Sequence, residues 1–420
     1  MARLEYIRYE FYDAFLDNFE DLEWLKLGKM PIDRLPQIFW DNGCGWDETN
    51  LWALERASSY QIDAETIKRT MKHLNRYANF LEIQGFDWRH FPVRKEDQVL
   101  RKYRKHLIDE VKTGLLASST ASSCMNAIIQ FYRFADRFSL VNSKNSKWSE
   151  RTVVLPFYDS IGFKRSMVRI TTDLKIPNRM RLGAALEDGL LPLRGDHVRE
   201  LLTYTAKHAI NELHLMLSTG FLTGARIGTI TTLTVSSLHS AREDLNTPGL
   251  YRLAVGPGTG IATKYSVSGE ILVPEAILAD LKAYTLSTRR LLREAKARQS
   301  EKNLLFLTQK GRPYTVETVN RLVYEMRQCA VKNGLEFMRS FRFHQSRATF
   351  GTWLMQVLLD AGAKTDAIRV VRDAMLHKDE KTTLGYITFL ENTRAKEQCA
   401  AAFNEAFTGL RSDRGNDEYA

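Results

Sequence analysis

A tyrosine with a histidine nine positions before it is the first candidate for chemistry in this sequence. Tyr386 lies in the polar stretch "LHKDEKTTLGYITF", residues 376–389, nine positions after His377. A phenol with a pKa near ~10 attacks nothing at neutral pH without help, because almost none of it is ionised. Tyr386 is therefore either a half-buried ring with a solvated hydroxyl or a nucleophile, and a nucleophile requires activating groups elsewhere in the sequence.

Two further stretches carry arginines in positions that favour a bound anion. In "TGARIGTI", Arg226 follows a Thr-Gly turn at a predicted helix start, where a guanidinium can bind a phosphate in bidentate fashion. In "FHQSRATFGTW", His344 and Arg347 are three positions apart, so a helix would point both side chains the same way. Three apolar residues are expected to anchor that helix in the core: Phe350, Trp353 and Leu354. Taken singly, each motif also fits an Arg or His in a structural hydrogen-bond network.

The first element expected to support this chemistry is a helical bundle over residues 50–140. Three amphipathic helices are predicted there, the first of which ends near Gly85. Basic residues follow the polar faces of the first two helices and are candidate DNA contacts: Lys68, Arg69, Lys72, Arg76, Arg101, Lys102, Arg104 and Lys105. Solvated charge on a helix surface is the alternative interpretation of the same residues.

The segments on either side of this bundle have no helical periodicity. Residues 141–182 contain nine Lys or Arg and three acids. We interpret residues 141–190 as a basic interdomain linker that lies along a phosphate backbone, with Lys164 and Arg165 among its DNA contacts. Residues 1–49 form an N-terminal extension rich in aromatic and acidic side chains, and the sequence predicts no role for it.

The second half of the chain mixes helices with short strands. Helices resume from Asp196, and "YRLAV", "IATKYSV", "EILVP" and "LLFLT" are predicted strands. Residues 191–395 are expected to form a catalytic domain, and residues 396–420 a C-terminal helix with a mobile tail. The predicted fold class is therefore mainly α with a small β-sheet, in two domains.

Composition limits the class of protein and of partner. Of 420 residues, 44% are hydrophobic and 26% charged, as in globular proteins with real cores. The N-terminal stretch is too highly charged for a signal peptide, no stretch is apolar enough to span a membrane, and the four cysteines lack metal-ligand spacing. We therefore expect a cytoplasmic protein without a metal site. A net charge of +10 suits a polyanionic partner, and nucleic acid is the first candidate.

In their order and spacing, the four motif segments resemble the tyrosine recombinase (phage integrase) family. The pattern is Arg226 in a TGxR turn, the HxxR pair His344 and Arg347, then His377 and Tyr386. Thr382 and Thr383 also fall where the family commonly has Ser or Thr. The resemblance covers roughly residues 195–395, and the bundle at 50–140 is similar to the family's SAM-like core-binding domain. It implies that Tyr386 is a nucleophile and that the chain is a site-specific DNA recombinase.

The resemblance also implies a role for each site residue. The family uses a lysine on a β-hairpin, and Lys264 is the only lysine between residues 208 and 281. The implied catalytic set is Arg226 and Arg347 as phosphate clamps, His344 and His377 as phosphate hydrogen-bond donors, Lys264 as general acid, and Tyr386 as nucleophile. The resemblance implies no cofactor and no metal. Implied partners are double-stranded DNA sites, other copies in a tetrameric synapse with the C-terminal helix docked in trans, and accessory proteins of the same mobile element.

Three departures from the family pattern concern the subfamily and remove no catalytic group. Ala348 follows Arg347 where His is frequent, Leu376 replaces the glycine usual before the last histidine, and Thr229 replaces a common acid. A type IB topoisomerase or telomere resolvase would use the same chemistry. A catalytically silent DNA-binding regulator is the alternative of another class. The DNA target, and the choice among integration, excision, transposition and resolution, are not readable from the sequence.

Overall fold

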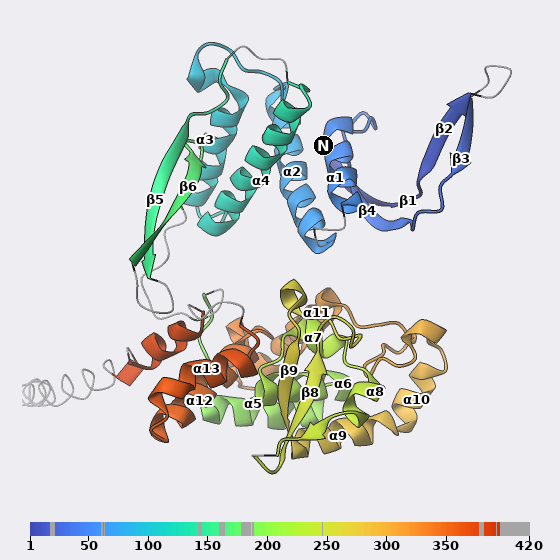
Figure 1. The fold of residues 1–420 in the computed structure, drawn as a ribbon, viewed down its shortest axis with the longest axis vertical. Helices are drawn as coiled ribbons and strands as arrows, with labels where there is room; N and C mark the ends of the chain where they lie inside the picture. Colours follow the sequence, from blue (N-terminus) through green and yellow to red (C-terminus); the bar gives the residue numbers. More distant parts are fainter. Residues whose placement is uncertain are drawn as a thin grey trace, which may run out of the picture. The chain divides into compact units, whose positions relative to one another are not determined.

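The computed structural model divides into two compact units, residues 1–181 and 182–420 (Figure 1). It describes all residues except 17–21, 60–61, 63, 142–144, 159–163, 178–185, 187–188, 246, 378–381, 392 and 395–420. The predicted tail at 396–420 and the basic residues Lys144, Arg179 and Arg181 lie outside the described residues. Among the residues that are described, no helix combines the length and the apolar character that crossing a bilayer requires.

The N-terminal extension forms strands. β1 (Arg3–Tyr9) pairs antiparallel with β4 (Ile32–Phe39), and Leu35 and Ile38 of β4 are buried against the bundle. Between them, β2 (Tyr12–Leu16) and β3 (Leu22–Lys26) form a second antiparallel ribbon that projects from the helices (Figure 1). Trp24 is 64% exposed on that ribbon, so these strands are held by their own pairing and not by a core.

The predicted helical bundle is present and contains four helices: α1 (Asp47–Ser58), α2 (Ala64–Gln84), α3 (Val99–Lys112) and α4 (Ser118–Arg137). A short 3-10 turn, η1 (Lys95–Asp97), precedes α3. Aromatic rings fill the centre of the bundle: Trp46 lies within 6.2 Å of the ring centroids of Trp88, Tyr77 and Phe131. Tyr77 and Tyr132 join their hydroxyl groups at 2.8 Å inside this core. The wide aromatic contact area stabilises a bundle of this size.

The expectation of irregular structure in the basic segment after the bundle is wrong. β5 (Glu150–Tyr158) and β6 (Lys164–Thr172) pair along their whole length as an antiparallel hairpin. Many of the residues are β-branched or aromatic, which favours strands. The sequence of this segment does not alternate between apolar and polar residues, which is the usual signal of a half-buried strand. The reason is that Val153, Val154 and Ile170 are all exposed, so neither face of the hairpin is buried at these positions.

The C-terminal unit surrounds a long buried helix with further helices and a small sheet (Figure 1). Its helices are α5 (Gly195–His208), α6 (Asn211–Thr223), α7 (Ile227–Thr231), α8 (Val235–His239), α9 (Glu275–Thr285), α10 (Thr288–Glu294), α11 (Val316–Lys332), α12 (Gln345–Asp360) and α13 (Lys364–Ala374). The short 3-10 turns are η3 (Lys264–Ser266), η4 (Gln299–Glu301) and η5 (Glu336–Ser340). Residues 382–391 are also helical. Nearly every residue of α6 is buried, so α6 is the centre of the unit.

The sheet of this unit is antiparallel, in the order β7 (Arg242–Glu243), β8 (Leu250–Val255), β9 (Gly269–Pro274). β8 and β9 confirm the predicted strands "YRLAV" and "EILVP". The predicted strand "LLFLT" is wrong: it makes only isolated bridges, Thr234 to Leu304 and Leu307 to Pro313. Its apolar run reflects burial in the core, a pattern that does not by itself distinguish a strand from a buried connection.

A buried ion cluster fastens α6 to the α9–α10 region. Glu212, at the start of α6, is fully buried. Its carboxylate accepts hydrogen bonds from Arg289 (2.7 and 3.0 Å) and Tyr284 (2.8 Å) and lies 2.8 Å from the Arg293 guanidinium. Burial alone would raise the pKa of the Glu212 carboxyl, but the hydrogen bonds from Arg289 and Tyr284 and the charge of Arg293 hold that pKa below its ordinary value.

Candidate active site

Arg347 is held by two backbone carbonyl groups. Arg347 is a buried residue of α12, and its Nη1 atom donates to the carbonyl oxygen of Gly224 at 2.6 Å. Nη2 donates to the carbonyl oxygen of Met375, the residue after α13. The planar guanidinium is thus oriented by the ends of two other helices. Carbonyl groups orient an arginine without cancelling its charge.

The Thr-Gly turn before Arg226 takes the predicted form. Gly224 closes α6 with φ +64, and a Cβ at this position would lie 2.3 Å from a ring carbon of Phe350. Both the backbone and the close approach of α12 therefore require glycine here. Two residues later, Arg226 is the N-cap residue of α7, which confirms the predicted helix start.

Arg226, Lys264 and Arg347 line one narrow cleft, together with Thr229 and Leu376. The three cations come from positions 38 and 83 residues apart in the sequence, and the fold brings them together. Such a cleft offers two guanidinium groups and an ammonium to a single anion, which is the arrangement that stabilises developing negative charge on a phosphate.

Lys264 does not lie on the predicted strand "IATKYSV". It begins η3, a short 3-10 turn in the connection between β8 and β9, and Tyr265 and Ser266 have positive φ values of 62° and 51°. Left-handed residues end a strand, because their carbonyl and amide groups no longer point along a ladder. The hydroxyl of Thr263 donates to the carbonyl oxygen of Val267 at 2.6 Å and closes this turn.

His377 and Tyr386 form a second group beside the cleft. The His377 Nδ1 atom and the Thr383 hydroxyl are 2.9 Å apart, and both residues are buried. The rings of His377 and Tyr386 stack with their centroids 6.1 Å apart. The Tyr386 side chain has 0% exposure and packs in an apolar cluster with Phe350 and other residues. The side chain of the nucleophile candidate is therefore buried in the protein.

The six predicted catalytic residues are thus brought together only in part. Arg226, Lys264 and Arg347 share the cleft, whereas His377 lines the neighbouring pocket on the other side of Leu376. His344 is the N-cap residue of α12, one turn before Arg347, and is partly buried. We predicted that His344 and Arg347 lie on one helix. Arg347 lies within α12, whereas His344 is the residue immediately before its first turn.

One of the three predicted core anchors of α12 is wrong. Phe350 is buried and Leu354 packs against the same cluster, but Trp353 is 62% exposed. Trp353 instead lines an apolar pocket on the C-terminal unit, together with Leu193, Phe221 and Leu390. Helical spacing alone assigned Trp353 to the core. A wide apolar stripe on a helix does not show which of its residues are buried and which face an open pocket.

The predicted DNA contacts of the bundle differ in their surroundings. Arg69, Lys72 and Lys105 are exposed. The others make contacts within the N-terminal unit: Lys68 with Glu65, Arg76 with Glu110, Arg101 with Asp173, and Arg104 with the carbonyl oxygen of Leu174. Lys164 and Arg165 lie on β6, paired with Tyr158 and Phe157, and their side chains lie outside the described parts of the structure.

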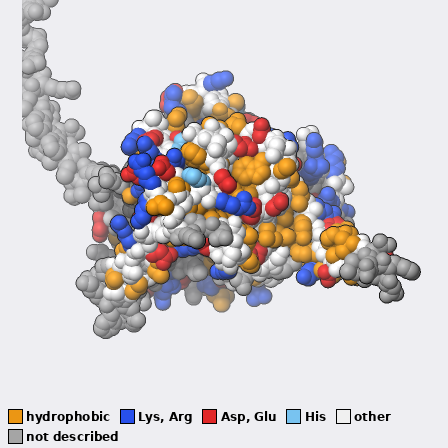
Figure 2. All heavy atoms as spheres, turned by 90° about the horizontal axis from the view of Figure 1, so that it is seen from above, with side chains coloured by type: hydrophobic (Ala, Val, Ile, Leu, Met, Phe, Trp, Pro, Cys, Tyr) orange, Lys and Arg blue, Asp and Glu red, His pale blue; other side chains and the backbone are white. Residues whose placement is uncertain are grey.

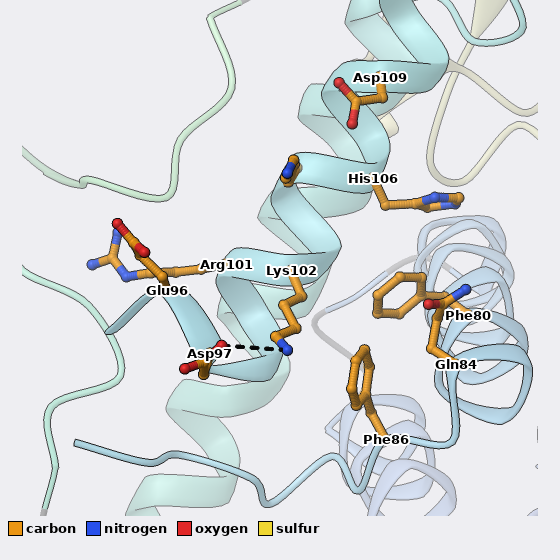
Figure 3. Close-up of a pocket in the computed structure, with 10 residues that line it drawn as sticks. Phe80, Gln84, Phe86, Glu96, Asp97, Arg101, Lys102, His106 and Asp109 are labelled. Atoms are coloured by element: carbon orange, nitrogen blue, oxygen red, sulfur yellow. Dashed lines mark ion pairs between the residues drawn. The ribbon is translucent and has the colours of Figure 1, made fainter. Parts of the chain in front are cut away.

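Lys102 lies beside both a carboxylate and an aromatic ring. Its ammonium group lies 3.5 Å from the Asp97 carboxylate and 4.8 Å from the centre of the Phe86 ring. Figure 3 shows Lys102 at the side of a pocket whose aromatic residues are Phe80, Phe86 and His106. On the face seen in Figure 2, lysine and arginine side chains lie in several groups with acidic and hydrophobic side chains between them.

Sequence reasoning missed the groups that hold the catalytic candidates. Thr383 fixes His377, and the only signal for it was its place in the Thr382-Thr383 pair. The carbonyl groups that orient Arg347 carry no sequence signal at all, because every residue has a carbonyl.

Comparisons with known proteins give one family match and several similar folds. Residues 192–392 match the model of the phage integrase family. The structure is similar to that of the Tn1549 transposon integrase in complex with circular-intermediate DNA, with 14% identity, 81% of this chain and 94% of that chain covered, and a TM-score of 0.50. A lambda integrase dimer bound to a COC′ core site is also similar, with 13% identity, coverage of 78% and 90%, and a TM-score of 0.45. At such identities the likeness is one of fold. No curated protein sequence matches.

Proposed function

We propose that this chain, which through residues 192–392 belongs to the phage integrase family of tyrosine recombinases, cuts and rejoins DNA at specific sites through a 3′-phosphotyrosine intermediate. Membership of the family makes it an enzyme that transfers DNA strands. The observation that supports cleavage through a phosphotyrosine is the cleft that Arg226, Lys264 and Arg347 line together. Three cations around one small space suit one phosphate of a DNA strand.

In the proposed reaction, the two arginines bind the non-bridging oxygens of the scissile phosphate. Arg347 is preorganised by its carbonyl partners, so little reorganisation is needed as charge grows in the pentavalent transition state. The Tyr386 oxygen forms a bond to phosphorus, while the bond from phosphorus to the 5′ oxygen breaks. His344 receives the tyrosine proton, His377 hydrogen-bonds the phosphate, and Lys264 gives a proton to the departing 5′ oxygen.

Resealing is the reverse of this step. A 5′-hydroxyl from another duplex attacks the phosphotyrosine, and Tyr386 leaves with a proton. The phosphodiester energy is kept in the covalent link, so the proposed reaction uses no ATP, and the arginines supply the electrostatic stabilisation that a metal ion supplies in other phosphoryl-transfer enzymes. We propose that the chain is encoded by a mobile element and acts in the cytoplasm, with double-stranded DNA sites and accessory proteins of that element as partners.

The N-terminal unit is proposed to hold DNA through its exposed cations. Arg69 and Lys72 on α2 and Lys105 on α3 are exposed and available to phosphates. Arg76 and Arg101 are held by the carboxylates of Glu110 and Asp173, so we assign them a smaller share of the binding. Affinity that rests on phosphate contacts falls steeply as salt rises.

Tyr386→Phe tests the proposed chemistry. The substitution removes one hydroxyl from a packed ring, so the fold and the salt-dependent DNA affinity should remain within a few-fold of wild type. Covalent protein–DNA adducts, measured on denaturing gels, should disappear. Wild-type protein that binds DNA but forms no adduct would support the silent regulator instead, and adduct formation by the Phe variant would sink the nucleophile assignment. Relaxation of supercoils without strand exchange between sites would favour a topoisomerase.

The C-terminal segment is proposed to join protomers. Residues 396–420 lie outside the described structure, and in the sequence they carry an apolar stripe at helical spacing: Ala400, Phe403, Ala406 and Phe407. The apolar pocket lined by Trp353, Leu193 and Leu390 is an acceptor of matching chemistry. We propose that this helix docks in that pocket on a neighbouring protomer and closes a cyclic tetramer around two DNA sites.

Truncation after Asn392 tests the docking. Single-site DNA binding should stay within a few-fold, because the truncation removes none of the residues that line the cleft or form the bundle. Cooperative binding to two-site DNA and strand exchange should be lost, as measured by gel shifts and a recombination assay. Trp353→Ser in the full chain should give the same defect from the acceptor side. A truncated protein that recombines at the full rate would show that the segment only caps its own domain.

A further inference from the structure

Leu376 occupies a backbone position that normally belongs to glycine. It follows the C-cap residue of α13 and has φ +50, in the left-handed region. Its amide donates to the carbonyl oxygen of Asp373, and the amide of His377 donates to the carbonyl oxygen of Arg372. This pair of bonds is the Schellman motif, in which the left-handed residue is most often glycine because a Cβ is strained there. The motif sets the position of His377.

Several other helices of this chain end with glycine in the left-handed region, whereas α4 ends there with a small polar residue, Ser139, at φ +55. Gly85 follows α2, Gly334 follows α11 and Gly362 follows α12, with φ values of +64, +90 and +82. The end of α13 keeps a leucine in the same conformation. A strained residue that is retained near a functional site points to a use for its side chain.

The Leu376 side chain fills the space above Gly269. A Cβ built on Gly269 would lie 2.4 Å from Leu376 Cδ2, although Gly269 itself has no positive φ. Gly269 is therefore needed for space and not for backbone freedom. It is the first residue of β9, and the strand begins five residues after Lys264. The leucine and the glycine are complementary: one supplies the volume that the other leaves open.

The connection that carries Lys264 is thus fixed near both of its ends. On the side of β8, the amide of Ala262 donates to the hydroxyl of Thr232 at 2.9 Å. On the side of β9, Gly269 contacts Leu376. Leu376 lines both the cleft of Lys264 and the neighbouring pocket of His377. Between the two anchors, the left-handed Tyr265 and Ser266 leave the turn without regular strand pairing.

We propose that Leu376 is a positioning residue for the general acid. Its side chain holds the β9 end of the connection against the turn that presents His377, and so places the Lys264 ammonium at the leaving 5′ oxygen. This inference rests on the proposed function, in which Lys264 donates that proton. The apolar Leu376 side chain offers no hydrogen bond to the phosphate or to the leaving group.

The test compares two DNA substrates in single-turnover cleavage by the full-length protein. One substrate has the normal 5′-bridging oxygen at the scissile phosphate, and the other has sulfur, a leaving group that needs no protonation. Leu376→Gly should cleave the oxygen substrate about 10- to 100-fold more slowly than wild type, which is a partial loss of the roughly 10²- to 10⁴-fold contribution of a general acid. On the sulfur substrate it should come within about 3-fold of wild type, because the misplaced proton donor no longer matters. Glycine suits the left-handed backbone, so the variant is expected to fold.

Leu245→Gly is the matched control, because this leucine is 98% exposed in the connection between β7 and β8 and should leave both rates unchanged. A double-mutant cycle tests the contact itself. Gly269→Ala should slow cleavage of the oxygen substrate in the wild-type background and have no effect in the Leu376→Gly background, where the clash is absent.

The outcomes that overturn the inference are distinct from those that overturn the proposed function. Leu376→Gly at the wild-type rate on oxygen, equal slowing on both substrates, or an equal effect of Gly269→Ala in both backgrounds would each reject the positioning role. Lys264→Ala is the reference: it should be slow on oxygen and recover on sulfur. If Lys264→Ala shows no recovery, the general-acid assignment fails, whatever Leu376→Gly does.

Discussion

The C-terminal unit contains two sets of buried arginines that are held in different ways. Arg347 in the cleft is oriented by the carbonyl groups of Gly224 and Met375. Arg293 also donates to a carbonyl, that of Leu307, but it lies 2.8 Å from the buried carboxylate of Glu212. Two of the groups around Arg347 are thus neutral carbonyls that fix the direction of its guanidinium, whereas Arg293 faces a buried carboxylate of opposite charge. Under the proposed function, Arg347 binds an anionic ligand and Arg293 fastens helices together.

The largest expected difference between Arg347 and Arg293 is in their response to substitution by lysine. A lysine keeps the charge but cannot span two acceptors with a planar fork. Arg347→Lys should lower the rate of adduct formation by about 10²- to 10³-fold, the range for loss of one preorganised donor. Arg293→Lys should leave the rate for folded protein within a few-fold and lower the midpoint of urea unfolding. Single-turnover cleavage and urea titration of both variants decide between them. Equal loss of cleavage in two folded variants would contradict the distinction.

Glu212→Gln should act on stability alone. The amide keeps the shape of the side chain but leaves the charges of Arg289 and Arg293 without their buried partner. We expect the free energy of unfolding to fall by about 3 kcal/mol, the low end for a broken buried ion pair because Arg289 is half-exposed to water. Urea unfolding measures the change, and adduct formation below the transition serves as the control. An unchanged unfolding midpoint would show that the cluster contributes little to the fold.

The smallest expected effect is a pH dependence of the same cluster. Because the pKa of Glu212 is lowered in the folded protein, its ionised form stabilises the fold above the ordinary carboxyl pKa. That contribution is lost as the pH falls through the lowered folded value. The difference in unfolding free energy between wild type and Glu212→Gln should therefore be constant from pH 7 to about 5 and shrink below that. Parallel curves down to about pH 3 would contradict it.

Periodicity and motif order reached a large part of this molecule from the sequence. The helical bundle follows from apolar spacing such as that of Ile67, Met71 and Leu74, all of which are buried. β8 and β9 follow from short β-branched runs between turns. Arg226 at a helix start follows from the Thr-Gly turn before it, because glycine at a helix end is a local signal.

Apart from the buried connection "LLFLT", the failures concern elements whose pattern is set by something other than a core. The β5–β6 hairpin is exposed on Val153 and Ile170, so no alternation announced it. The turn of Lys264 depends on the left-handed Tyr265 and Ser266, which no local propensity requires. The exposure of Trp353 depends on how α12 packs against the other helices, which its own sequence does not show. The contact of Leu376 with Gly269 joins residues 107 positions apart, and only the fold reveals it.

The complete burial of Tyr386 has a consequence for how such a protein searches a chromosome. A molecule that moves along DNA passes very many phosphates before it reaches its own site, and each passage is a chance of damage. If Tyr386 is the nucleophile, as proposed, its ring must leave the apolar cluster before its oxygen can reach a phosphate. The reaction rate would then be scaled by the fraction of molecules in which the ring is exposed. Under the proposed function, this small fraction limits cleavage away from the proper site before any bond is made.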